Sequence, residues 1–366
     1  MTLHLYFARR FLTVFLGTFL TFAAMLGLID MLEQIRSFDM ADIGFVEVLR
    51  LTLLNLPAGL ARILPLITIL ASVILFLNLA RTSELVISRA AGRSALWSLT
   101  APVAVAAILG VLAVAGLNPI VAATSKQYEV LANRFNPQTA SVLSLSQGAL
   151  WLRQGGADGQ TVIRASDSSL DGTELKSVTF LGFDPDGSPA YRIEADRAHL
   201  ADGAWQLTGV KEWRFDDSIA NPEREAVRTD KMVLESDLTV DRIRDSFGTP
   251  SSIPIWDLPR FIRQLEDSGF SARSHRVWFQ MELSLPVLLA AMVMVGAGFT
   301  MRHVRFGHSG VMVLLALMMG FGVYFIRNFA QVLGDRGQIP VELAAWSPPV
   351  AAVLLSLGLL LHLEDG

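Results

Sequence analysis

The sequence predicts an α-helical membrane protein with six transmembrane helices and an all-β, jellyroll-like domain inserted between the third and the fourth. Hydrophobic residues make up 52% of the 366 positions and charged residues 17%, a balance too apolar for a soluble chain of this length. The apolar runs fill positions 11–123 and 277–362, whereas 125–272 has the composition of a soluble segment. Two environments are therefore expected, with domains at 1–124, 125–272 and 273–366.

The first of the six spans follows Arg9 and Arg10 and is expected to stay uncleaved. Each span needs about 20 mostly apolar residues, because a helix rises 1.5 Å per residue across roughly 30 Å of hydrocarbon. Pro57 interrupts a longer apolar stretch that begins at Ile43, which favours a short interfacial helix before the second span. The expected spans are Phe11–Ile29, Ala58–Ala80, Leu96–Ala123, Val277–Met301, Gly310–Gln331 and Ala344–Leu361.

Arginines in the short loops predict the orientation of the chain. They precede the first span, follow the second within residues 81–93, and follow the fourth at Arg302 and Arg305. By contrast, residues 30–50 contain Asp30, Glu33, Asp39, Asp42 and Glu47 against two arginines. Both termini are therefore expected in the cytoplasm and the inserted domain on the outside.

The inserted domain shows short alternating segments that are separated by turn signals such as Asp184–Gly187. This pattern is typical of an antiparallel sandwich or open barrel. The hairpin around residues 191–210 is either sandwich core or one side of an open sheet that holds acyl chains. An amphipathic helix is expected over Pro259–Ser268. The expected strands are Ala149–Arg153, Thr161–Ala165, Ser177–Phe183, Tyr191–Ala198, Ala204–Phe215 and Lys231–Leu234.

Several kinds of site are excluded by composition and motif. The chain has no cysteine, so it offers no disulfide framework, zinc–cysteine site or thiol nucleophile, and its net charge of −4 gives no reason to expect a nucleic-acid partner. No Walker phosphate loop, H-E-x-x-H or G-x-S-x-G motif occurs. Glu282 lies near the outer end of its span, where solvation at the interface is a sufficient explanation, although an acid within a membrane span also calls for a functional hypothesis. The sequence therefore predicts a chain that is not an enzyme and binds no metal or cofactor.

The loop after the second span predicts a short helix with exposed apolar residues. Ser83 is its expected cap and Gly92 its expected end. Such a helix either lies flat on the inner leaflet or docks, as a coupling helix, into a groove of a nucleotide-binding partner. In the second case Glu84 and Arg89 make polar contacts, while the apolar side chains to be buried are Leu85, Val86 and Ile87.

The segment Ser83–Gly92 resembles the coupling-helix motif of the lipopolysaccharide export permease family, which comprises the LptF and LptG subunits. The layout of six spans with one β insertion after the third is similar too. So are the tail segments Gly320–Phe325, Gly337–Pro340 and Ala345–Pro348. Gln147–Leu152 resembles the G subunit more than the F subunit.

The resemblance implies a permease subunit of an ABC transporter in the inner membrane of a Gram-negative bacterium. Such a subunit extracts lipopolysaccharide and passes it to a periplasmic β-domain bridge toward the outer membrane. The implied partners are a second permease similar to LptF, an ATPase dimer similar to LptB that uses ATP and Mg, and a single-span β-domain protein similar to LptC. A membrane-anchored scaffold whose β domain recruits periplasmic partners is the alternative.

The same resemblance implies where substrate and ATPase act. Spans one and five would form lateral gates with the second permease. Basic side chains near the outer surface would contact lipid A phosphates, although headgroup anchoring explains them as well; these are Arg36, Arg62 and Arg134. Phe321, Tyr324 and Phe325 would either line an acyl cavity or pack against a neighbouring helix. The implied ATPase-coupling residues are Ser83, Glu84, Leu85, Val86, Ile87, Arg89 and Gly92.

Overall fold

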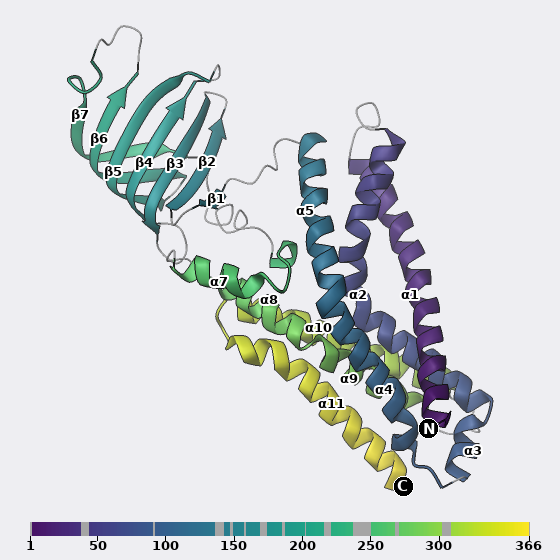
Figure 1. Cartoon of the computed structure of the whole chain (residues 1–366). Coiled ribbons are helices and arrows are strands. Elements are labelled where there is room, and N and C mark those ends of the chain that lie inside the picture. Colours follow the sequence, from purple (N-terminus) through teal and green to yellow (C-terminus); the bar gives the residue numbers. More distant parts are fainter. Residues whose placement is uncertain are drawn as a thin grey trace. The chain divides into compact units, whose positions relative to one another are not determined.

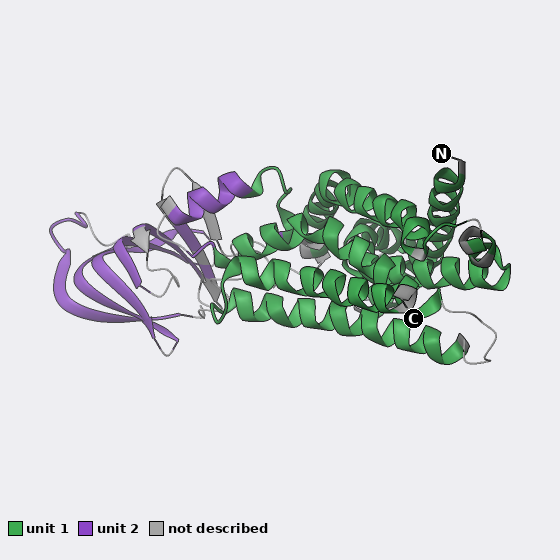
Figure 2. Ribbon diagram, turned by 90° about the horizontal axis from the view of Figure 1, so that it is seen from below, with its two compact units in different colours: residues 1–136, 251–258, 273–366 green, residues 137–250, 259–272 purple. Residues whose placement is uncertain are grey.

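The computed structural model describes most of the chain. The described residues are 2–37, 44–90, 92–135, 143–146, 149–156, 159–168, 174–184, 187–201, 203–215, 221–236, 250–267, 271–301 and 309–365. They divide into two compact units (Figure 2). Unit 1 is helical and comprises residues 1–136, 251–258 and 273–366, whereas unit 2 holds the strands and comprises residues 137–250 and 259–272.

Unit 1 begins with two long helices (Figure 1). α1 spans Thr2–Ser37, and α2 spans Phe45–Arg81 as one continuous helix. The expectation of a separate interfacial helix before the second span is therefore wrong. α2 has Pro57 and Pro65 in its interior. Each proline removes one backbone donor, which membrane helices tolerate because neighbouring groups satisfy the freed carbonyls.

The third span contains a π-helical turn. α4 covers Ala95–Leu112, the π-helix η1 covers Ala113–Leu117, and α5 continues over Asn118–Phe135. The Ser94 hydroxyl caps α4 by accepting a hydrogen bond from the Trp97 N–H at 3.1 Å. A π-turn redirects the side chains that follow it, and such turns are frequent at functional sites.

The fourth span is broken into two helices. α8 (Arg273–Leu283) and α9 (Leu285–Thr300) meet at Ser284 with a bend of 49°. Pro286 stands at the start of α9 and has no N–H to donate to the Glu282 carbonyl four residues earlier. The span is present where the sequence predicts it, but the bend was not expected.

Two further helices complete the set of spans. α10 covers Ser309–Asp335 and α11 covers Val341–Asp365. Within the described ranges, five helices are long and apolar enough to cross a membrane, and the bent pair α8–α9 makes a sixth when it is taken as one span. The chain is thus a multi-pass membrane protein, and the expected fold class is confirmed.

The helices of unit 1 are held by a phenylalanine stripe and by small residues. On α1, Phe7, Phe11 and Phe15 are buried at four-residue spacing, which places them on one face. Between α2 and α9, Gly296 leaves room for Ser72, whose hydroxyl donates to a backbone carbonyl of α9 at 2.9 Å. A Cβ on Gly296 would lie 2.5 Å from the Ser72 Oγ. Such close approach is typical of contacts between membrane helices.

Unit 2 contains an antiparallel sheet whose seven described strands follow chain order (Figure 1). All six predicted strands are present as β2 to β7, which confirms the inserted all-β domain. β1 was not predicted, because four residues of leucine and serine carry too short a pattern. The strands are β1 Leu143–Ser146, β2 Ala149–Gly156, β3 Gly159–Ser168, β4 Glu174–Phe183, β5 Pro189–Ala201, β6 Ala204–Arg214 and β7 Val227–Glu235.

The buried side chains of the sheet include the apolar positions of the predicted hairpin. Ile193 on β5 and Leu207 on β6 are buried at 3% and 1% exposure. The rings of Phe180 and Trp205 meet edge to face at 6.1 Å, and both are fully buried. These positions support the interpretation of the hairpin as core.

The amphipathic helix predicted over Pro259–Ser268 is present as α7, which spans Leu258–Asp267. Ile262 and Leu265 are buried, as expected for the apolar face of such a helix. The preceding 3-10 turn η3 covers Pro250–Ser252.

Candidate functional site

The predicted coupling segment contains a short helix, α3, over Glu84–Ala90. The carbonyl of Ser83 accepts the first helical hydrogen bond, from the Ile87 N–H at 3.1 Å. Ser83 itself has a left-handed φ of 59°, in place of the extended backbone that is usual at a cap. Gly92 has a φ of 74°, the conformation with which glycine commonly follows a helix. The helix therefore lies where the sequence predicts it.

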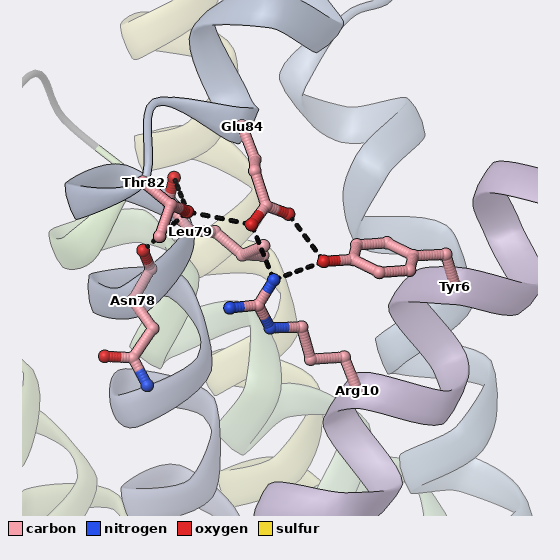
Figure 3. A network of polar contacts seen from close by, with 6 residues as sticks. All are labelled: Tyr6, Arg10, Asn78, Leu79, Thr82 and Glu84. Carbon is pink, nitrogen blue, oxygen red and sulfur yellow. Dashed lines mark hydrogen bonds and ion pairs between the residues drawn. The ribbon is translucent and has the colours of Figure 1, made fainter.

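Glu84, the first residue of α3, is bonded to two residues of α1 (Figure 3). Its Oε2 accepts a hydrogen bond from the Tyr6 hydroxyl at 2.9 Å, and its Oε1 accepts one from Arg10 Nη1 at 2.6 Å. Arg10 also donates to the Tyr6 hydroxyl. The Thr82 hydroxyl lies 2.9 Å from Glu84 Oε1 and 3.0 Å from the Asn78 carbonyl, so its one proton is shared between two acceptors. A single carboxylate thus joins α3 to α1 and to the end of α2.

These bonds change the ionisation of Glu84. Partial burial of the carboxyl opposes its charged form, but the hydrogen bonds from Arg10, Tyr6 and Thr82 outweigh this effect and lower the pKa of Glu84 below its ordinary value of 4.5. The carboxylate is therefore charged at neutral pH. The side chains of Arg10 and Glu84 are 29% and 27% exposed, so solvent weakens the pair relative to a fully buried one.

The apolar side chains of α3 differ in exposure. Leu85 is buried at 5%, whereas Ile87 is 67% exposed. The side chains of Val86 and Arg89, which the sequence analysis also assigned to coupling, lie outside the described residues. α3 therefore packs one apolar side chain on its own chain and presents another outward.

The three aromatic candidates on α10 lie on different sides of that helix. Phe321 and Phe325 are 55% and 70% exposed, and Leu314 and Met318 extend the same exposed apolar surface. Tyr324 instead lines a cavity. An exposed apolar face of this kind needs lipid or another helix to cover it.

The two candidate arginines whose side chains are described lie in different surroundings. Arg62 lines the same cavity as Tyr324. Arg36 is exposed in the last turn of α1, and the side chain of Arg134 lies outside the described residues. The predicted substrate residues whose side chains are described therefore do not form one cluster.

The cavity that contains Arg62 and Tyr324 lies within unit 1 and has a volume of about 320 Å³. The π-helix η1 contributes two of its apolar residues, and the residues on either side of the α8–α9 break border it as well. Both irregular points of the helical bundle thus meet here, as expected where backbone departs from a regular helix beside a cavity. Polar side chains that line it include Arg62, Asn118, Trp278, Glu282, Tyr324 and Arg327.

Glu282 and Arg327 are two charged residues of this cavity whose surroundings were not predicted. Glu282 lines the cavity and its carboxyl is largely shielded from solvent, so solvation at the interface is not a sufficient explanation for it. Arg327 was not singled out, although a lone arginine in an apolar span is a signal for function. The two attract each other electrostatically, but no ion pair within 4.0 Å joins them in the described part of the chain.

α1 is also bonded to its neighbours near its C-terminal end. The Asn55 amide of α2 donates to Asp30 Oδ1 at 2.6 Å, and the Gln34 amide donates to the Tyr128 hydroxyl of α5 at 3.0 Å. α1 is therefore fastened by polar contacts close to both of its ends.

Comparison with known proteins matches nearly the whole chain. Residues 5–362 match the family described as lipopolysaccharide export system permease LptF/LptG. A relative from Escherichia coli strain K12, named lipopolysaccharide export system permease protein LptG, is 24% identical over 366 residues, which are 98% of this chain and 97% of the relative. One with the same name from Haemophilus influenzae is 22% identical over 373 residues, 100% and 99% of the two chains. These matches confirm the resemblance seen in the sequence, including its greater similarity to the G subunit.

Proposed function

Since this chain belongs to the lipopolysaccharide export permease family LptF/LptG, we propose that it is a permease subunit of an ABC transporter that extracts lipopolysaccharide from the inner membrane. The observation that carries the proposal is the match over residues 5–362, which includes all the apolar spans and the inserted sheet. The extracted lipid passes to a β-domain bridge that leads through the periplasm toward the outer membrane.

The proposed arrangement places both termini and α3 in the cytoplasm and the sheet of unit 2 in the periplasm. A second permease similar to LptF covers exposed apolar faces of α1 and α10, which form the lateral gates. A single-span protein similar to LptC continues the β bridge. The exposure of Phe325 and Leu20, at 70% and 66%, supports a partner or lipid at these faces.

ATP is hydrolysed in a separate dimer similar to LptB, which holds the ATP and Mg, and this chain contributes no cofactor of its own. The ATPase docks on α3, where the exposed Ile87 provides an apolar anchor. Glu84 passes the movement of α3 to α1 through Arg10 and Tyr6. Arg89, Val86 and Leu85 complete the coupling segment.

The substrate is held by charge at its headgroup and by apolar contact along its acyl chains. Arg36 and Arg134 form charge-assisted hydrogen bonds with lipid A phosphates, whereas Arg62, the third candidate, belongs to the cavity of unit 1. Phe321 and Phe325 border the acyl chains, and Tyr324 stands between these chains and the polar cavity. The outward exposure of Arg36, Phe321 and Phe325 supports a substrate that contacts the surface of the helices.

Co-purification of the full chain from its native membranes in mild detergent tests the proposal. We expect an ATPase and a second permease to co-purify, with ATP hydrolysis that rises when lipopolysaccharide is added. Ile87→Asp should release the ATPase, whereas Val233→Asp, at a position of matched 69% exposure in unit 2, should retain it. Recovery of periplasmic partners without an ATPase would favour the scaffold alternative, and turnover by this chain alone would refute the proposal.

A further inference from the structure

The cavity of unit 1 contains two buried donors that lack an acceptor. Arg327 Nε and Trp278 Nε1 are buried and have no hydrogen-bond partner among the described residues. Both side chains line the cavity. A buried donor without an acceptor is costly, most of all when it is charged. The two unpaired donors therefore make the cavity suited to a ligand that supplies an acceptor.

Glu282 is not that acceptor, because neither Arg327 Nε nor Trp278 Nε1 has a hydrogen-bond partner among the described residues; its carboxylate is held by Asn118 instead. Asn118 Oδ1 accepts a hydrogen bond from the Ile255 N–H at 2.9 Å, which leaves the amide hydrogens of Asn118 for the Glu282 carboxylate. Asn118 follows directly on the π-turn η1, so this irregularity of the backbone positions the contact. Arg327 stays beyond ion-pair distance and remains available to a ligand.

The charge and shape of the cavity define the class of that ligand. Its lining contains two arginines and one glutamate, so its formal net charge is +1. The planar guanidinium fork of Arg327 matches the geometry of carboxylate and phosphate oxygens. A volume of about 320 Å³ lies at the lower end of the roughly 300–1,000 Å³ that is usual for small-molecule sites. The cavity therefore accommodates an oxyanion together with part of its substituents.

The approach to the cavity combines polar and apolar surface. Arg62 is an exposed residue of the lining, so the cavity reaches the surface of the described chain there. Ala58, Leu64 and Pro65 of the same helix also line it. Such a mixture suits an anionic group attached to an apolar body.

We propose that this cavity binds a monoanionic phosphodiester, the group found in membrane phospholipid headgroups. Arg327 and Trp278 donate to its oxygens, Arg62 stands at the opening, and Glu282 sets the net charge of the site to match one negative charge. A phosphomonoester carries about −1.5 to −2 at neutral pH, so its binding would leave a net negative charge in the cavity. The site does not depend on the proposed transport function, since its donors and charges belong to this chain alone.

Lipid binding to the full chain, purified in mild detergent with the chains that co-purify, tests this site by native mass spectrometry. The probes are phosphatidylglycerol, lipopolysaccharide with its phosphomonoesters, and soluble dimethyl phosphate as competitor. We expect one tight phosphatidylglycerol per chain that lipopolysaccharide does not displace. Displacement by dimethyl phosphate identifies a site for any free phosphodiester, and its failure to displace identifies a site for the lipid. Preferential binding of lipopolysaccharide would overturn the proposed ligand class.

Variants of Arg327 and Glu282 should change the affinity for phosphatidylglycerol in opposite directions. Arg327→Gln should weaken phosphatidylglycerol binding about ten- to a hundredfold, and Glu282→Gln should strengthen it about fivefold, because it removes the opposing charge. Arg336→Gln, an exposed position just beyond α10, should leave binding unchanged. If Arg327→Gln does not fold, Arg327→Lys and Glu282→Gln carry the same test. Equal weakening by the Arg327 and Glu282 variants, or no effect of either, would show a structural pair in a hydrated cavity and overturn the proposal.

Discussion

Replacing Glu84 with glutamine should release α3 from α1. The substitution keeps the shape of the side chain but removes the charge that accepts from Arg10 at 2.6 Å and from Tyr6 at 2.9 Å. An exposed ion pair contributes about 0.2–1 kcal/mol, and a hydrogen bond to a charged group about 1.5–3 kcal/mol. Because the two side chains are 29% and 27% exposed, we expect an interaction energy of about 1 kcal/mol between Arg10 and Glu84, a roughly fivefold change in the equilibrium constant for docking of α3.

A spin label on α3 measures this docked fraction directly. The chain has no cysteine, so Ile87→Cys, at an exposed position, can be labelled without background. Label mobility is compared in Glu84→Gln, Arg10→Gln and the double variant, which isolates the pairwise interaction. Arg81→Gln is the matched control, since Arg81 is exposed at the end of α2 and has no hydrogen bond or ion pair with a described residue.

Two results would refute this reasoning. The first is strict additivity of the Arg10 and Glu84 variants, which would mean that the residues do not interact. The second is a wrong dependence on pH. Because the pKa of Glu84 is lowered from 4.5, the contact is fully present above pH 4.5 and is lost as the pH falls through the lowered value. A transition near neutral pH, or one that persists in Glu84→Gln, would contradict the assignment.

Two further predictions concern packing. Gly296→Leu should destabilise the helical unit by about 1–3 kcal/mol, because its Cβ meets the Ser72 Oγ at 2.5 Å, whereas Gly17→Leu, at a site with nothing within 4 Å, should not; thermal unfolding in detergent compares them, and equal melting temperatures would exclude a close α2–α9 contact. Trp205→Ala should cost the sheet about 3–5 kcal/mol, since Trp205 is fully buried, and Trp256→Ala, 69% exposed, serves as its control; limited proteolysis within unit 2 should accelerate in the first variant alone.

The parts of the fold that were predicted are those with a local signal. An apolar run of about 20 residues marks a span wherever it occurs, and alternation with turn residues marked β2 to β7. β1 was missed because four residues are too few to show a period. The bend at Ser284 and the π-turn at Ala113–Leu117 were missed because both interrupt the helix without interrupting its hydrophobicity.

The contacts of the candidate sites were beyond sequence reasoning for a different reason. Arg10 and Glu84 are 74 positions apart, and only the packing of α1 beside α2 and α3 brings them together. The short helix over Glu84–Ala90 was predicted from its residues, but the partner of Glu84 within the chain was not. Likewise, the outer position of Glu282 in its span suggested solvation, whereas the broken helix directs it to a cavity that also contains Arg327.

In the proposed coupling through α3, the polar contacts near both ends of α1 would let this helix act as a lever. Arg10 is twenty residues from Asp30, roughly 30 Å along the helix, and Asp30 is six residues from Arg36, roughly 9 Å. With the Asp30–Asn55 bond as the fulcrum, a displacement of about 1 Å at Arg10 tilts α1 by about 2° and moves Arg36 about 0.3 Å in the opposite direction. The longer arm points toward α3. The movement at Arg36 is therefore smaller than the movement at Arg10 by a factor of about three, and the force at Arg36 is larger by the same factor. A small, strong movement at the far end is what loosening a tightly packed contact demands.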